Sequence, residues 1–321
     1  MNSSDATELG ARLAARDRTA APPALNLLEE RGPGSAERSN ALLNELSPAK
    51  LGHEAPGMIV GITGPPGAGK STLLSELINR WRKRDKSVAV LAIDPSSKRS
   101  GGSLLGDRAR MAVDSRDADV LVRSSATATR LGGLAPTTRE AAIALASAFD
   151  VVIVETVGVG QSETDIGELA DTVVVIVQPA SGDVLQFIKS GVMEIPDLLV
   201  VTKADLGVPA KRAARDLEAA VKSLGSHAAV LQVSSISPVT GVDELIDAVE
   251  THFQTIDLTA RRADSRRLAA LDAYAHEHGE KGLRALGGRR AAEKAMAEQD
   301  PLLGHRELLK LLEARAAGQR D

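Results

Sequence analysis

Residues 64–71 are the feature of this chain that most narrows what it can fold into. They run Gly-Pro-Pro-Gly-Ala-Gly-Lys-Ser and match the pattern GxxxxGK[ST] at every fixed position. An apolar run at 58–63 precedes them and a helical pattern at 70–84 follows, the context that this motif requires. The sequence therefore predicts a P-loop, in which backbone N–H groups and a helix N-terminus hold phosphate oxygens. A plain glycine-rich turn is the alternative.

The residues of this loop are expected to have different roles in binding a nucleotide. The glycines allow the backbone to approach phosphate closely, Lys70 is expected to reach the β and γ phosphates, and the Ser71 hydroxyl is expected to bind Mg²⁺. Lys70 is therefore also a candidate catalytic residue. The candidate phosphate contacts are Gly64, Gly67, Ala68, Gly69, Lys70, Ser71 and Thr72.

Short β-branched runs alternate with helical patterns through the middle of the chain. The predicted strands are 58–63, 87–93, 119–123, 151–154, 172–177, 198–202 and 230–234, and the predicted helices are 70–84, 137–149, 183–193, 210–224 and 242–253. Nearly continuous apolar strands indicate a parallel sheet buried on both faces. The pattern predicts an α/β fold with a mostly parallel, doubly wound sheet, which binds ligands at the carboxyl ends of its strands.

Both ends of the chain lack strand patterns. Leucine stripes separated by Pro and Gly predict a helical N-terminal extension over 1–50, and Ala/Leu stripes predict a helical C-terminal region over 258–321. The sequence thus divides into 1–50, a P-loop domain over 51–257, and 258–321.

A candidate base-binding segment follows the predicted strand 198–202. Residues 202–205 run Thr-Lys-Ala-Asp and resemble the [NT]KxD motif of GTPases. The carboxylate of Asp205 can accept hydrogen bonds from guanine N1–H and the 2-amino group, which adenine cannot offer, and Lys203 would lie along the ring face. The alternative is a surface Lys and Asp closing a strand. Guanine O6 is expected to meet a backbone donor among Ser234, Ser235 and Ile236.

Carboxylates near predicted strand ends suggest a magnesium site. Asp94, Asp107 and Glu155 supply the hard oxygen ligands that Mg²⁺ prefers, and Glu155 is also a catalytic candidate. A strand-end cap for Asp94 and a solvated loop charge for Asp107 are the alternatives. Gly158, three residues after Glu155, stands where a backbone N–H can sense the γ-phosphate. The next residue is Val159 rather than a water-orienting Gln, which predicts slow hydrolysis.

A further polar segment spans 178–189. Gln186 and Lys189 are expected on one helical face, and Lys189 could reach the phosphate site after a rearrangement, or be an ordinary solvated lysine. Gln161 is a second candidate near the site, and the sequence leaves open whether Lys189 or Gln161 acts in hydrolysis.

Composition excludes several classes of function. The net charge is −4, aromatic residues are 2%, and there is no cysteine, which argues against nucleic-acid platforms, disulfides and thiolate metal sites. No apolar run reaches the length of a membrane span, and we expect neither a secretory signal nor membrane association but a cytoplasmic location. His276 and His278 are close in sequence but diverge on a helix, so no histidine metal site is expected.

Four segments together resemble the MeaB/ArgK-type G proteins: GITGPPGAGKST, LAIDPSSKRSGGSLLGDRARM, LGGLAPTTRE and VETVGVGQSETDI. The resemblance implies a homodimer whose C-terminal region is a dimerisation arm. It also implies three switch segments, at 94–107, 155–168 and 178–191. The chain departs from the family after residue 261, where the usual aromatic residues of the arm are missing over 261–271.

The resemblance also implies a function. Proteins of this type use GTP and GDP with Mg²⁺ and accompany adenosylcobalamin-dependent acyl-CoA mutases such as methylmalonyl-CoA mutase, gating cofactor loading and protecting or reactivating the enzyme. We therefore expect a GTPase that is slow alone and stimulated by its partner. The alternatives are a nickel-type metallochaperone GTPase, an ATP-dependent kinase, and a nucleotide-gated scaffold whose hydrolysis is incidental.

Overall fold

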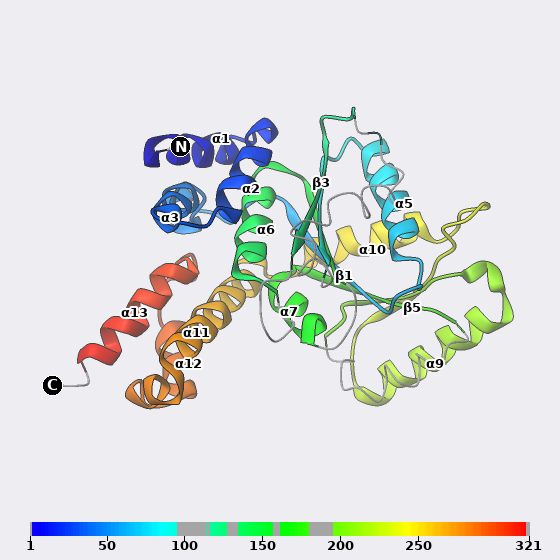
Figure 1. The fold of residues 1–321 in the computed structure, drawn as a ribbon. Helices are drawn as coiled ribbons and strands as arrows, with labels where there is room; N and C mark the ends of the chain where they lie inside the picture. The colour runs from blue at the N-terminus through cyan, green and yellow to red at the C-terminus, as the bar shows by residue number, and fades with distance from the viewer. Residues whose placement is uncertain are drawn as a thin grey trace.

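A seven-stranded sheet in the order β3-β2-β4-β1-β5-β6-β7, with every pairing parallel, forms the centre of the molecule (Figure 1). The computed structural model describes residues 2–94, 114, 116–126, 134–156, 161–179 and 195–318. The strands are β1 (Met58–Thr63), β2 (Val88–Asp94), β3 (Val120–Ala126), β4 (Val151–Thr156), β5 (Thr172–Val177), β6 (Leu198–Val201) and β7 (Ala229–Gln232). The predicted parallel α/β fold is confirmed.

Helices connect the strands and extend the chain at both ends. They are α1 (Ser3–Ala14), α2 (Ala21–Glu29), α3 (Ser35–Glu45), α4 (Pro48–Leu51), α5 (Lys70–Lys83), α6 (Pro136–Ala148), α7 (Gln161–Leu169), α9 (Val208–Leu224), α10 (Val242–Thr255), α11 (Leu258–Ala285), α12 (Arg289–Ala297) and α13 (His305–Gly318). The predicted helix over 183–193 lies outside the described residues. Among the described helices, none is long and apolar enough to cross a membrane.

Element boundaries differ from the expected ones for local reasons. Strand β4 runs to Thr156 rather than ending at Val154, because its partners β1 and β2 continue alongside it as far as Glu155 and Thr156. Helix α9 begins at Val208, before the predicted start at Ala210, because a proline at its second position fits the first helical turn.

Two hydrophobic cores lie on the two faces of the sheet. Helices α5 and α10 cover one face, where Trp81 and Leu245 are fully buried against residues such as Val60 of β1. Helices α6, α7 and α9 pack on the other face, to which the preceding residue of β1, Ile59, belongs. Because alternate strand residues enter opposite cores, both β1 and β5 are buried throughout their length.

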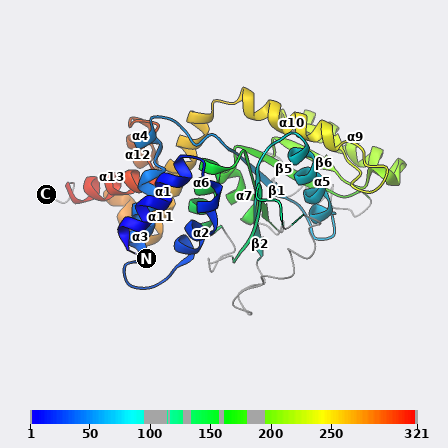
Figure 2. The same cartoon turned by 90° about the horizontal axis from the view of Figure 1, so that it is seen from above.

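The two ends of the chain lie on the same side of the sheet. Helices α1 and α2 contact α6, and α11 contacts α7, so that both helical regions stand next to the α6–α7 layer (Figures 1 and 2). Helices α11, α12 and α13 also have a core of their own around Tyr274 and Met296. Helix α11 bends at Gly279, whose φ of +59° interrupts the helical conformation.

Two buried arginines attach α11 to the sheet. The Arg262 guanidinium bonds both carboxylate oxygens of Asp171 at 2.8 and 2.6 Å and the backbone carbonyls of Ala55 and Gly57 at 2.6 and 2.7 Å. One turn further, Arg266 bonds the Glu54 carboxylate at 3.1 and 2.7 Å. The C-terminal region is therefore fixed to the segments that enter β1 and β5.

Candidate nucleotide-binding site

The loop between β1 and α5 has the backbone of an anion site. Gly64, Gly67 and Gly69 have φ values of +152°, +78° and +87°, which favour glycine. A Cβ at Gly64 would also lie 2.5 Å from the carbonyl oxygen of Ile176. Within the described chain, no side chain caps the N-terminus of α5 at Gly69, so the first N–H groups of this helix are open to a phosphate oxygen.

Lys70 holds a buried positive charge inside this loop. Its Nζ donates hydrogen bonds to the carbonyl oxygens of Gly64 at 2.7 Å and Pro65 at 3.0 Å. Burial lowers the pKa of Lys70, and the nearby Glu155 partly opposes this shift. A phosphate reaching the loop would replace the two carbonyls as the partner of the ammonium group and would favour its charged form.

The candidate magnesium ligands come from strands that end at the same edge of the sheet. Glu155 of β4 lies in register with Ile62 of β1 and Ala92 of β2, and Asp94 is the last residue of β2. The Ser71 backbone lies in the same first turn of α5 as Lys70. Carboxylate and hydroxyl oxygens are ligands that Mg²⁺ prefers.

Two buried hydroxyl groups at the carboxyl ends of the strands indicate that a polar ligand could bind there. Thr63 Oγ1, at the end of β1, and Thr156 Oγ1, at the end of β4, have no hydrogen-bond partner among the residues that the structure describes. Buried polar atoms are rarely left without one, so a hydrated ion or phosphate beside them fits the donor set. Asp107, Gly158 and Lys189 lie outside the described residues, and Gln161 begins helix α7.

The 202–205 segment contacts the P-loop from the end of β6. Thr202 Oγ1 donates a buried hydrogen bond of 2.7 Å to the Ala68 carbonyl oxygen. Lys203, in the left-handed conformation with φ of +55°, places its Nζ 3.0 Å from the Gly67 carbonyl oxygen. The Nζ is also 3.0 Å from Oε1 of Gln178. The sequence had not predicted the role of Thr202, whose hydroxyl fixes the backbone of the phosphate loop.

Asp205 meets the second candidate base segment. The Ser234 hydroxyl lies 3.0 Å from Oδ1 of Asp205 and 3.2 Å from the Ile236 carbonyl oxygen. Ser235 is half-buried, and Ile236 is 56% exposed. The structure thus brings the segments 202–205 and 234–236 together beside the P-loop, with the Ser234 hydroxyl within hydrogen-bond distance of Asp205.

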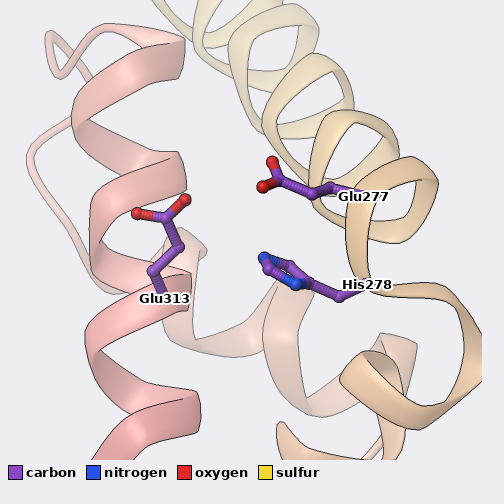
Figure 3. Close-up of side chains that lie close together, drawn as sticks. All are labelled: Glu277, His278 and Glu313. Carbon is purple, nitrogen blue, oxygen red and sulfur yellow. The ribbon is translucent and has the colours of Figure 1, made fainter.

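A separate group of metal-type side chains lies far along the C-terminal helices. Glu277 and His278 of α11 and Glu313 of α13 place ligand atoms within 4.8 Å of one another (Figure 3). From the sequence, His278 was expected to diverge from His276 on a helix and no histidine metal site was expected; the fold places His278 beside two carboxylates. All three side chains are exposed, and exposed acidic groups commonly gather without an ion. These residues have no part in the nucleotide site.

The fold and this site define the class of the protein. A parallel sheet with a phosphate loop after β1 and a guanine-type base motif after β6 is the arrangement of a P-loop GTPase. The chain belongs to the family described as methylmalonyl Co-A mutase-associated GTPase MeaB, which matches residues 22–281. The family resemblance seen in the sequence is confirmed.

Individual relatives agree with this assignment. A protein of Mycobacterium tuberculosis named as a probable GTPase is 42% identical over 262 residues, covering 78% of this chain and 76% of the relative. The mouse methylmalonic aciduria type A homolog, mitochondrial, is 45% identical over 221 residues, covering 65% of this chain and 53% of its own length. A crystal structure of an LAO/AO transport system kinase covers 98% of both chains with a TM-score of 0.67 and 25% identity.

Proposed function

We propose that this GTPase hydrolyses GTP to GDP and phosphate, slowly alone and faster with a partner, an adenosylcobalamin-dependent acyl-CoA mutase whose cofactor loading it gates. The observation that carries the proposal is the family match over residues 22–281, which includes both the phosphate loop and the base motif. Protection or reactivation of the mutase belongs to the same proposal, as does a cytoplasmic location.

Guanine selection is assigned to Asp205. Its carboxylate accepts a hydrogen bond from the Ser234 hydroxyl at 3.0 Å and can accept two more donors from one base edge. Adenine would leave the two remaining acceptor positions of that carboxylate without donors, and a site built to hydrogen-bond a substrate group rejects an analogue that lacks it. Lys203 would cover the ring face, and Ser235 and Ile236 would offer backbone groups at the base edge.

The phosphate chemistry is assigned to the loop and the strand ends. Lys70 would move its Nζ from the carbonyls of Gly64 and Pro65 to the β and γ phosphate oxygens, where it stabilises the charge that develops during transfer. Mg²⁺, when bound, would neutralise charge on the same phosphates, and Ser71 would hold it with Asp94, Asp107 and Glu155 as candidates for its water shell. Glu155 also remains a catalytic candidate.

The residue after Gly158 sets the rate that we expect. With Val159 where many small GTPases have Gln, turnover alone should be roughly 10⁻⁴ to 10⁻² s⁻¹. The partner would raise this rate by ordering a switch segment, and Lys189 is the candidate residue for that step, with Gln161 as the alternative.

The partner is supported by names of relatives. The family is described as associated with methylmalonyl-CoA mutase, and the mouse relative is named for methylmalonic aciduria. A homodimer formed through the C-terminal helices is part of the proposal. An ATP-dependent kinase is less well supported, although the LAO/AO neighbour is named a kinase, because Asp205 would disfavour adenine. A nickel chaperone is less well supported because the chain has no cysteine.

Phosphate release measured with GTP and with ATP, with and without purified mutase, tests the proposal. We expect slow release from GTP alone, faster release with mutase, and none from Lys70→Ala protein. Lys189→Ala should keep the slow rate and lose most of the stimulation, whereas Lys211→Ala, at an exposed position of α9, should be stimulated fully. Release from ATP equal to that from GTP would refute the base assignment, and a mutase that binds in neither nucleotide state would refute the partner.

A further inference from the structure

A cavity of about 90 Å³ lies near the amino ends of the central strands, whereas the P-loop follows their carboxyl ends. Its lining includes Ala55 and Ile59, at the amino end of β1, whereas the phosphate loop follows the carboxyl end of β1 at Thr63. The other lining residues come from α3, the segment 46–54 that contains α4, helices α6, α7 and α11, and residues 304–307 at the start of α13. The cavity is therefore separate from the nucleotide site and lies where the N-terminal helices, the sheet layer and the C-terminal helices meet.

One wall of the cavity is apolar and the cavity reaches the surface. Leu43, Leu46, Ile143 and Leu169 contribute aliphatic side chains from three different parts of the chain. Exposed Asn44 also lines it, so the space opens to solvent. A volume of about 90 Å³ is several times the roughly 10–15 Å³ that one water molecule needs, so a small organic molecule fits.

Arg139 brings an incompletely neutralised positive charge to this cavity. One of its terminal nitrogens donates to the Glu168 carbonyl at 3.1 Å and to the Ser265 hydroxyl at 2.5 Å. Its closest carboxylate within the described chain, that of Glu168, is 3.9 Å away. The other three arginines of the lining are each paired with a carboxylate: Arg262 with Asp171 at 2.6 Å, Arg266 with Glu54 at 2.7 Å, and Arg306 with Glu140. Glu54 and Glu140, which also line the cavity, are thus neutralised by these partners. Arg139 is thus the lining cation best able to take an added anion.

His305 adds an unused hydrogen-bonding group. Its imidazole lines the cavity, and neither ring nitrogen has a hydrogen-bond partner anywhere in the described residues. Burial lowers the pKa of His305 to about 4, with smaller contributions from Arg306, Arg139 and Arg266. The ring is therefore neutral at neutral pH and can donate one hydrogen bond and accept another.

We propose that this cavity is a second ligand site, which binds a small amphipathic carboxylate. The carboxylate would pair with Arg139 and take a hydrogen bond from His305, while a short alkyl chain would lie against Ile143 and its aliphatic neighbours. An apolar pocket with a few convergent polar groups is the usual form of a small-molecule site. The aliphatic wall favours a carboxylate with an alkyl chain over inorganic phosphate, which has no apolar part.

The test uses three probes of equal length on the full chain: butyrate, butyramide and butylamine. Binding is measured by saturation-transfer NMR near neutral pH. We expect butyrate to bind with a Kd on the order of 1 mM and at least roughly tenfold more tightly than butyramide, with no binding of butylamine. Equal affinities for butyrate and butyramide, or no saturation by butyrate at about 100 mM, would overturn the proposal.

Variants locate the bound probe. Ile143→Phe should fill the cavity and abolish butyrate binding without removing any charge. Arg139→Met should weaken butyrate binding by at least roughly tenfold and leave butyramide unchanged. Arg212→Met, which removes an exposed arginine of α9, is the control and should bind butyrate like the unmodified protein. Undiminished butyrate binding by Ile143→Phe would overturn the site, and this variant decides the matter if Arg139→Met does not fold.

Discussion

Replacing Arg262 by Met is expected to be among the most destabilising single changes in the chain. The guanidinium makes four hydrogen bonds of 2.6 to 2.8 Å, two to the Asp171 carboxylate and two to the backbone carbonyls of Ala55 and Gly57. Asp171 is fully buried and also accepts a hydrogen bond from the Ile59 N–H at 2.7 Å. Arg262→Met would leave that carboxylate buried without a cation and two carbonyls without donors.

The magnitude follows from the burial of the pair. Removing one partner of a buried ion pair destabilises a protein by about 3–5 kcal/mol. Arg267→Met is the matched control, because Arg267 lies on the same helix and pairs at 2.9 Å with Asp264, whose side chain is 70% exposed. Because the carboxylate of this pair remains in solvent, whereas the Arg267 side chain is 21% exposed, the pair is expected to contribute about 1 kcal/mol or less.

Urea unfolding followed by far-ultraviolet circular dichroism measures both changes. The double variant Arg262→Met with Asp171→Asn should recover part of the loss, because the amide keeps an acceptor for Ile59 and carries no charge. If Arg262→Met loses no more stability than Arg267→Met, the claim that this pair attaches α11 to the sheet is wrong.

Three further changes test other parts of the structure. Thr202→Val removes the 2.7 Å bond to the buried Ala68 carbonyl and should weaken GDP binding by about 1–3 kcal/mol in calorimetry, with unchanged binding arguing against this support of the P-loop. Asp205→Asn should shift preference from guanosine to xanthosine nucleotides, and a retained preference for GTP would contradict the base assignment. The pKa of His305 is lowered from 6.5 to about 4, so the unfolded chain takes up a proton at a higher pH than the folded chain does. About 3 kcal/mol of folding stability should therefore be lost as the pH falls from 6.5 to about 4. His305→Gln should flatten this part of the pH dependence, and equal slopes for both proteins would exclude the histidine as its source.

Local patterns in the sequence predicted the strands and most of the helices of the central domain, but not helix α7 and not which elements are neighbours. The strands were recognisable because a parallel strand buried on both faces needs apolar side chains at nearly every position, as in β5. The insertion of β4 between β1 and β2 was not predictable, since hydrophobic periodicity carries no information on pairing. The ends of strands also depend on pairing, which is why β4 continues past Val154 to Thr156.

In the candidate site, too, local features could be predicted from the sequence and contacts between distant residues could not. The loop at 64–71 could be predicted because its function lies in contiguous residues. The bond from Thr202 to Ala68 joins residues 134 positions apart and leaves no local signal. The arginines near the start of α11 looked alike in sequence, and only the positions of Asp171 and Glu54 decide that Arg262 and Arg266 are the buried ones.

Strand β1 and helix α7 both run between the nucleotide site and the cavity at the opposite end of the strands, and they differ in how firmly they are held. Strand β1 is buried along its whole length and hydrogen-bonded to β4 and β5, so displacing it would break pairing on both sides. Helix α7 is held by packing and by hydrogen bonds from the Leu134 N–H to Asp165 and from Arg139 to the Glu168 carbonyl, without a strand ladder. It begins directly after residues 157–160 and ends at Leu169 in the cavity wall. Interfaces between packed helices shift at lower free-energy cost than paired strands, because no ladder of backbone hydrogen bonds is lost. We therefore expect any influence between the nucleotide and the cavity to pass more readily through α7 than through β1, and linkage requires that it act equally in both directions.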